Sequence, residues 1–207
     1  PWMDSELEAR FPEALANFSG HESVGGKKVR VYQDVVRGKH GFRLTIGDVA
    51  YEGEPQVDMG AAQGVQFSSR PDFVLWPTMS GRKPVVIFLD GYQYHADKTA
   101  GDLLKRQSLM HAGFIVWSLN WYDVNLVLGD KAIDVPLLTG ITSSEHNHKA
   151  VAGLARMAKA NHFAKHLGKT TFELLMGILT QQNQDQLGVE ALLFVLQCLP
   201  ADTMADA

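Results

Sequence analysis

The fold is decided by residues 71–119, which read PDFVLWPTMSGRKPVVIFLDGYQYHADKTAGDLLKRQSLMHAGFIVWSL. Two apolar runs, residues 72–76 and 85–89, flank the turn-forming residues 77–84 and predict a two-stranded hairpin. The second run, VVIFL, has no polar position, which is typical of a strand that is buried on both faces. The second strand of the hairpin is therefore expected in the interior of the protein.

A helix and a further strand follow the hairpin. Residues 98–112 have a helical pattern that ends before Gly113, and residues 114–119 form another continuous apolar run. The helical pattern places these residues near one side: Leu103, Leu104, Gln107, Met110 and His111. Because a helix that connects two strands favours parallel pairing, we expect a mixed sheet with a parallel pair at its end.

The segment before the hairpin predicts one helix and several strands. Residues 4–18 repeat apolar side chains at helical spacing, and Pro12 predicts a break or two short helices there. The small and polar residues 60–69 predict a loop. Three further runs are strand candidates, the first of them strongly alternating: 28–36, 42–46 and 54–58.

The sequence changes character after about residue 129, where the strand signal ends. Three helical stretches are expected there: 145–167, 170–183 and 187–198. The predicted fold is therefore α/β, a mixed β-sheet flanked by helices in residues 1–129. Residues 130–207 form a helical C-terminal region that packs on this core or on a partner domain. A helical protein–protein adaptor, with its function in residues 140–207, is a further possibility.

Composition limits the classes of function. Among 207 residues, 19 Lys and Arg against 23 Asp and Glu give a net charge of −4, and 45% are hydrophobic, which excludes wholesale disorder. The acidic balance argues against a stand-alone nucleic-acid-binding protein. No apolar run approaches the ~18 residues of a membrane span, so no membrane contact is expected. The single cysteine, Cys198, favours a reducing compartment, most simply the cytoplasm.

Candidate functional residues gather in and after the hairpin. Asp72 begins one predicted strand, Asp90 ends the next, and Gln93 and His95 follow. Carboxylates on neighbouring strands, about 4.8 Å apart, can share one divalent ion, and oxygen ligands suit Mg²⁺ or Mn²⁺. A nearby histidine can exchange protons. The alternative from the residues alone is turn chemistry, since Asp before Gly commonly ends a strand.

The same motifs resemble the PD-(D/E)xK nuclease superfamily, most closely its very-short-patch-repair-type endonuclease domains. The resemblance covers residues 4–123. The combined order of the motifs is more specific than each motif alone. It is carried by Glu8 and Phe11, Pro71-Asp72-Phe73, Asp90-Gly91 with His95, Asp102 with Arg106, Gly113, and Val116-Trp117.

This resemblance implies a restriction-endonuclease-like fold and a Mg²⁺- or Mn²⁺-dependent deoxyribonuclease. Asp72 would be the central metal carboxylate, and the backbone carbonyl of Leu89 would complete the coordination. Asp90 would be a second ligand or would polarise the water. His95 would contact phosphate or act as an acid or base, and Glu8 would orient a metal-bound water. Gln93 is a lesser catalytic candidate, and the cations that would contact DNA are Arg70, Lys98, Lys105 and Arg106.

The sequence departs from the superfamily pattern at Phe88, where many relatives carry a glutamate, and no lysine follows. The repair-type branch also lacks that lysine. The alternative is therefore a catalytically degenerate domain of the same fold, used for docking DNA or protein.

The sequence also resembles the C-terminal modules of very large DEAD/DEAH-box helicases of bacterial anti-phage defence systems of the Druantia kind. A start at Pro1 fits a module excised from such a chain. The partners implied are DNA and a tethered helicase domain or other defence-system subunits.

Overall fold

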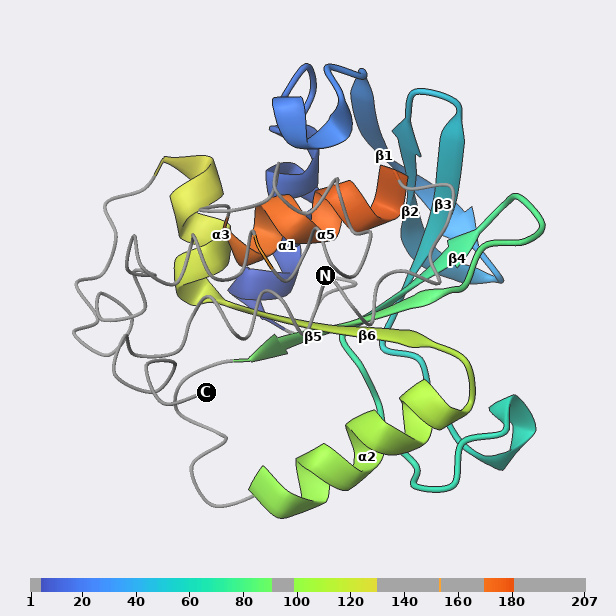
Figure 1. Ribbon diagram of the computed structural model, residues 1–207. Helices are drawn as coiled ribbons and strands as arrows, with labels where there is room; N and C mark the ends of the chain where they lie inside the picture. The colour runs from blue at the N-terminus through green and yellow to red at the C-terminus, as the bar shows by residue number, and fades with distance from the viewer. Residues whose placement is uncertain (1–4, 91–98, 130–152, 154–169, 181–207) are drawn as a thin grey trace, which may run out of the picture.

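The computed structural model describes residues 5–90, 99–129, 153 and 170–180 (Figure 1). The described elements are, in chain order, helix α1 (Glu6–Ala16), the 3₁₀ turn η1 (Glu22–Val24), strands β1 (Val29–Val36), β2 (Lys39–Ile46) and β3 (Val49–Pro55), the 3₁₀ turn η2 (Ala61–Gln63), strands β4 (Phe73–Pro77) and β5 (Val85–Asp90), helix α2 (Thr99–His111), strand β6 (Ile115–Asn120), and helices α3 (Trp121–Leu128) and α5 (Thr171–Thr180).

All six strands form one mixed sheet in the order β1-β2-β3-β4-β5-β6. Neighbouring strands from β1 to β5 are antiparallel, whereas β6 runs parallel to β5, with Val85 opposite Ile115 and Asp90 opposite Asn120. The α/β class, the mixed sheet and the parallel pair after the crossover helix are thus confirmed. The parallel arrangement brings the carboxyl ends of β5 and β6 to the same edge of the sheet.

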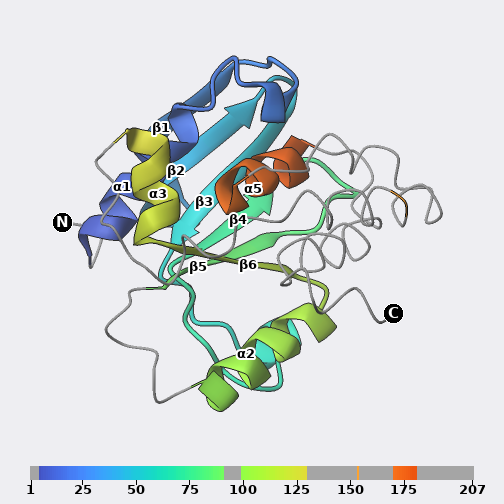
Figure 2. The ribbon, with the colours of Figure 1, turned by 60° about the vertical axis from the view of Figure 1, so that its left-hand side comes forward.

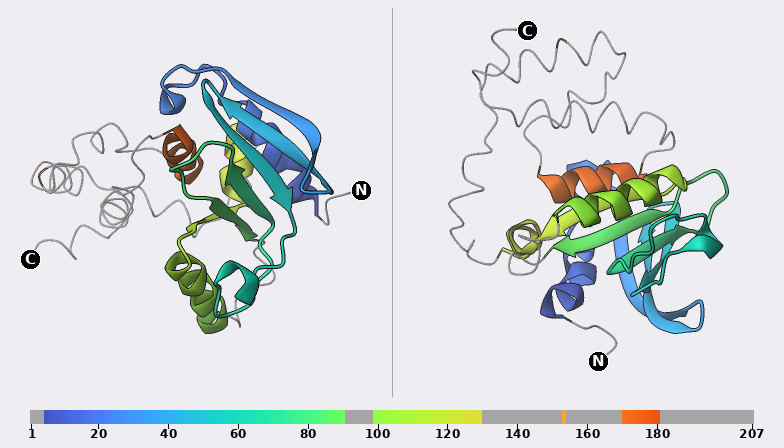
Figure 3. Two further views of the ribbon diagram at one scale, coloured as in Figure 1. Left: turned by 90° about the vertical axis from the view of Figure 1, so that its right-hand side faces the viewer. Right: turned by 90° about the horizontal axis from the view of Figure 1, so that it is seen from below.

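Helices cover the two faces of the sheet unequally (Figures 1 and 2). Helices α1, α3 and α5 lie on one face, and α2 lies on the other beside the η2 loop, as the left panel of Figure 3 shows. The loop is tied to the helix because Ser108 Oγ accepts the backbone N–H groups of Gln66 and Phe67 at 2.7 and 3.0 Å. Ser108 itself is buried. The loop and α2 therefore form one wall beside the sheet.

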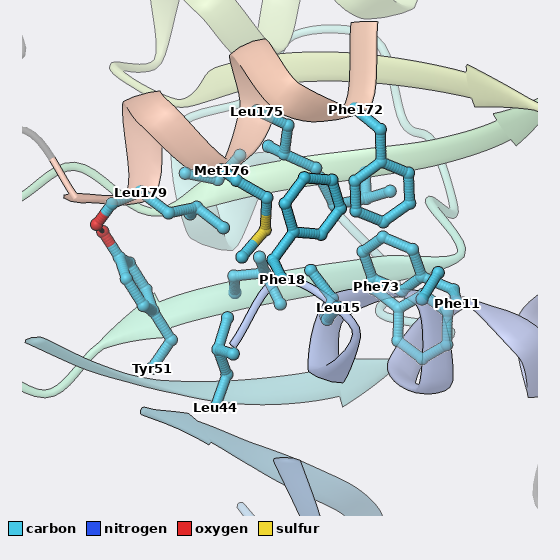
Figure 4. Close-up of a cluster of buried hydrophobic side chains, with 14 of the residues drawn as sticks. Phe11, Leu15, Phe18, Leu44, Tyr51, Phe73, Phe172, Leu175, Met176 and Leu179 are labelled. Carbon is cyan, nitrogen blue, oxygen red and sulfur yellow. Dashed lines mark hydrogen bonds between the residues drawn. The ribbon is translucent and has the colours of Figure 1, made fainter. Parts of the chain in front are cut away.

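Aromatic rings fill the core between the sheet and the three helices (Figure 4). The Phe11 ring of α1 lies 5.2 Å from that of Phe73 and 5.9 Å from that of Phe172, all three being fully buried. The hydroxyl of Tyr51 donates to the carbonyl oxygen of Leu179 at 3.0 Å, and Arg82 donates to both oxygens at 3.2 Å. Through α5, residues after 129 thus contribute to the same core as the sheet.

Three local expectations are wrong. Helix α1 continues through Pro12 without a break, because Phe11 and Leu15 on either side are fully buried and their packing offsets the lost backbone hydrogen bond. The third strand is Val49–Pro55 rather than 54–58. Strand β2 begins at Lys39, three residues before the expected 42.

The buried face of α2 also differs from the expected one. The helix buries Ser108 and Leu109, whereas Leu103, Leu104 and Met110 are 55%, 46% and 51% exposed. The predicted helices 145–167 and 187–198 lie outside the described residues, apart from Gly153.

Candidate functional site

A pocket of about 230 Å³ opens where the start of β4, the end of β5 and helix α2 meet. Its lining combines two carboxylates, three cationic side chains, an aromatic ring and backbone. The lining residues are Ser69, Arg70, Asp72, Phe88, Leu89, Asp102, Lys105 and Arg106. Five of these were candidates from the sequence, namely Arg70, Asp72, Leu89, Lys105 and Arg106, and the fold brings them together from segments up to 36 residues apart.

Asp72 is fixed at this pocket by the backbone of the neighbouring strand. Its Oδ2 accepts a hydrogen bond from the N–H of Leu89 at 2.7 Å. The two strands pair with Phe73 opposite Ile87, so continuing the register by two residues would place Pro71 opposite Leu89. The Asp72 carboxylate thus accepts the Leu89 N–H, which in a continued ladder would donate to the backbone carbonyl of Pro71.

The carbonyl of Leu89 lies on the same edge of its strand. In an extended strand the N–H and C=O of one residue point to the same side, so this carbonyl also points toward the Asp72 segment. Proline has no N–H, and Pro71 therefore cannot complete a ladder hydrogen bond to that oxygen. The Asp72 carboxylate and the Leu89 carbonyl therefore lie at the same edge of β5, next to the pocket.

Each cationic side chain of the pocket has a defined neighbour. Arg70 pairs with Asp58 at 3.9 Å, and Lys105 pairs with Asp102 across one turn of α2 at 3.4 Å. The guanidinium carbon of Arg106 lies 5.1 Å from the centroid of the Phe88 ring. Three cationic and two anionic side chains give the lining a local positive excess, although the chain as a whole is acidic. Such a lining favours an anion.

Glu8 does not line this pocket. It lies in the first turn of α1, where Ser5 Oγ accepts its N–H and donates to its Oε1, both at 3.2 Å. This pattern is that of a helix cap, although Glu8 as a whole is only 3% exposed. Glu8 lies one turn before Phe11, whose ring stacks on Phe73, the residue after Asp72. The core thus connects α1 to the Asp72 segment through the opposite face of the sheet.

The remaining candidates lie at or beyond the end of β5. The backbone of Asp90 ends that strand opposite Asn120 of β6. Gln93, His95 and Lys98 lie outside the described residues. Their predicted roles as catalytic or DNA-binding residues stay predictions.

The pocket contains residues that the sequence reasoning did not assign to the site. Asp102 belongs to the Asp102–Arg106 motif of the resemblance without a role of its own. In the structure it lines the pocket and contacts Lys105. Its spacing of three from Lys105 on a helix was the available signal. The sequence marks Phe88 only as a departure from the superfamily pattern. Ser69 gave no signal, since it belongs to the predicted loop.

The donors at the pocket suit a hard divalent cation in kind, since a carboxylate and a backbone carbonyl are oxygen ligands. Within residues 5–90, 99–129 and 170–180, no cluster of three or more His, Cys, Asp or Glu side chains could hold a metal ion. Asp72 and the Leu89 carbonyl would therefore need further ligands from water, from substrate or from the residues after Leu89.

No family model, curated protein or solved structure matches the chain. In the described part of the chain, no helix is long and apolar enough to cross a membrane.

Proposed function

We propose that the Asp72 pocket is the active site of a Mg²⁺- or Mn²⁺-dependent deoxyribonuclease that hydrolyses phosphodiester bonds. The observation that carries this proposal is the shared pocket of Asp72, Leu89 and three cations. Asp72, the Leu89 carbonyl and Asp90 would hold the metal. When bound, the metal would lower the pKa of a water and neutralise phosphate charge.

The cationic side chains of the pocket suit the binding of the phosphate. Arg70, Lys105 and Arg106 would hold the phosphate by charge-assisted hydrogen bonds and stabilise the negative charge that develops during hydrolysis. Asp102 would orient Lys105, as their 3.4 Å contact allows. His95, from the segment after β5, would donate or accept the proton. Glu8 does not line the pocket, so it is given no step in this chemistry.

The size of the pocket favours one group of a polymer over a complete small molecule. Pockets for drug-sized ligands span roughly 300–1,000 Å³, and this one has about 230 Å³. It suits a phosphate and its immediate surroundings, while the rest of the nucleic acid would lie outside. The order β4, β5, α2, β6 agrees with the order of motifs on which the resemblance to PD-(D/E)xK nucleases rests.

Recruitment of DNA would need help from elsewhere. A net charge of −4 gives no bulk attraction to a polyanion, although the pocket lining itself carries three cations and two anions. A tethered helicase domain or another defence-system subunit would deliver the strand to the cytoplasmic nuclease module.

One observation favours a second candidate function. Phe88 occupies a place in the lining where a carboxylate would add a metal ligand, and it contacts Arg106 instead. A degenerate domain that docks nucleic acid without cleaving it would keep the cations and have no need for the metal.

Calorimetric titration of Mn²⁺ into the wild type, Asp72→Asn and Asp48→Asn tests the proposal. Asp48 is the matched control because it is an exposed carboxylate paired with Lys27 outside the pocket. We expect the wild type and Asp48→Asn to bind Mn²⁺ and to cleave DNA, and Asp72→Asn to do neither. Cleavage by Asp72→Asn at the wild-type rate would refute the site. A wild type that binds no Mn²⁺, even with DNA present, would favour the docking function.

A further inference from the structure

Phe88 and Arg106 form the one cation–π pair within the pocket lining. The guanidinium carbon lies 5.1 Å from the ring centroid, within the ~6 Å reach of a cation–π interaction. The partners come from different elements, since Phe88 lies near the end of β5 and Arg106 in the middle of α2. Their contact therefore depends on how the helix is placed against the sheet.

The ring of Phe88 is held in place by its strand. Side chains alternate along β5, so Phe88 faces the side opposite to Ile87 and Leu89, which belong to the large core. It packs instead against the second cluster of buried residues, which includes Val86 and Leu109 of α2. Extending the β4–β5 register by one residue would place Phe88 opposite Asp72. The ring is thus a fixed surface beside the proposed metal carboxylate.

A cation–π contact does not use the guanidinium N–H groups as hydrogen-bond donors. Those donors lie in the guanidinium plane and match the geometry of phosphate oxygens. Arg106 can therefore contact the Phe88 ring and donate to a phosphate at the same time. The ring also restricts a side chain that otherwise loses considerable rotamer freedom when it binds a ligand.

We infer that Phe88 is a positioning residue that holds the Arg106 guanidinium in the pocket, so that the pocket binds a phosphodiester without a divalent cation. The inference rests on the proposed function in taking a nucleic-acid phosphate as the ligand. It goes beyond that function in separating phosphate binding, by Arg70, Lys105 and Arg106, from metal binding at Asp72. Phe88 then contributes to phosphate binding independently of the metal.

The test is the binding of a short fluorescein-labelled deoxyoligonucleotide in EDTA, followed by fluorescence anisotropy. We expect Phe88→Leu to weaken binding about two- to fivefold, the range of an exposed cation–π contact. Phe88→Tyr should bind as the wild type because the ring face is kept. The matched control is Phe114→Leu, since Phe114 belongs to the same cluster but stacks edge-on against Trp76 outside the pocket.

A double-mutant comparison separates positioning from a general structural effect. Arg106→Gln should weaken binding more than Phe88→Leu does, and adding Phe88→Leu to Arg106→Gln should change nothing further. If Phe88→Leu binds as the wild type, or weakens binding equally in the Arg106→Gln background, the inference is overturned. Should Phe88→Leu fail to fold in a thermal melt, wild-type binding by Arg106→Gln would overturn it instead.

The outcome is independent of the proposed catalysis. Coupling between Phe88 and Arg106 in EDTA, together with no Mn²⁺ binding or cleavage, would uphold the inference and refute the nuclease. Cleavage that depends on Asp72, without coupling between Phe88 and Arg106, would uphold the nuclease and refute the inference.

Discussion

The Asp72 carboxylate accepts the backbone N–H of Leu89 at 2.7 Å, and this single contact joins the structural and chemical parts of the pocket. Structurally, it continues the pairing of β4 with β5 beyond Phe73 and Ile87, the last pair of the ladder. Chemically, it fixes a carboxylate beside a backbone carbonyl. The proposed metal ligand therefore also stabilises the sheet, and its two roles can be separated by substitution.

Asp72→Asn and Asp72→Ala are expected to differ in stability, although both remove the charge. The asparagine oxygen can still accept the Leu89 N–H, whereas alanine leaves that N–H without this acceptor. We expect Asp72→Ala to lower the free energy of unfolding by about 1–3 kcal/mol, and Asp72→Asn by clearly less. Urea unfolding in EDTA measures both. Equal losses would show that the hydrogen bond contributes little to the fold.

The pocket cations are expected to determine how salt affects oligonucleotide binding. Each phosphate contact that is lost should reduce the slope of log K against log salt by about 0.7 for a single strand. We expect this reduction for Arg70→Gln and for Lys105→Gln, measured by anisotropy in EDTA. Lys27→Gln is the control, because Lys27 pairs with Asp48 outside the pocket. An unchanged slope in both pocket variants would place the phosphate elsewhere.

Strands β5 and β6 could be predicted closely because each is a nearly pure apolar run that follows a proline or a glycine and ends before an aspartate or an asparagine. Residues 85–89 became Val85–Asp90, and residues 114–119 became Ile115–Asn120. In β5, burial on both faces makes the run visible in the sequence without knowledge of its partners, whereas β6 is only half-buried except at Leu119.

Strand β3 was missed because its identity depends on contacts made across the sheet. Its sequence, VAYEGEP, contains charges and a glycine. Gly53 is required there because a Cβ would lie 2.4 Å from the ring of Phe42 on the neighbouring strand. Only the register of β2 against β3, with Phe42 opposite Gly53, explains the residue. A pattern read within one segment does not contain that information.

The candidate site could be predicted only in part, because some of its contacts are made between distant segments. Asp72 stands out because it begins an apolar run, whereas Leu89, Lys105 and Arg106 were expected only from the resemblance to PD-(D/E)xK nucleases. The Phe88–Arg106 contact and the place of Asp102 in the pocket depend on how α2 lies against the sheet. The residues that α2 exposes, Leu103, Leu104 and Met110, are as apolar as those it buries, so periodicity alone could not orient it.

Helix α5 is expected to be indispensable for the fold. Phe172 is fully buried, and its ring lies 5.2 Å from that of Phe18 and 5.9 Å from that of Phe11. We expect Phe172→Ala to lower the free energy of unfolding by about 3–5 kcal/mol, and a chain that ends at residue 129 to lack cooperative thermal unfolding. Met110→Ala is the control, since Met110 is 51% exposed. Cooperative unfolding of residues 1–129 would show that the sheet needs no C-terminal helix.

Asp123 is expected to make stability depend on pH in an unusual direction. Burial raises the pKa of this carboxyl above its ordinary value of 3.8, and hydrogen bonds from Asn120 and Thr171 oppose that rise only in part. Because the folded state favours the protonated form, the contribution of Asp123 to stability is fully present below pH 3.8. It is lost as the pH rises through the folded-state pKa.

Asp123→Asn tests this dependence, since its side-chain oxygen can still accept the Asn120 N–H, now 2.9 Å from the carboxylate. Asparagine does not ionise, so we expect the variant to gain stability relative to the wild type as the pH rises from below 3.8 to neutral. Thermal melts across that range measure the difference. Asp48→Asn should show the opposite trend, because the pKa of exposed Asp48 is lowered by its own backbone N–H and by Lys27. If the difference between Asp123→Asn and the wild type does not change with pH, Asp123 titrates alike in the folded and unfolded chains.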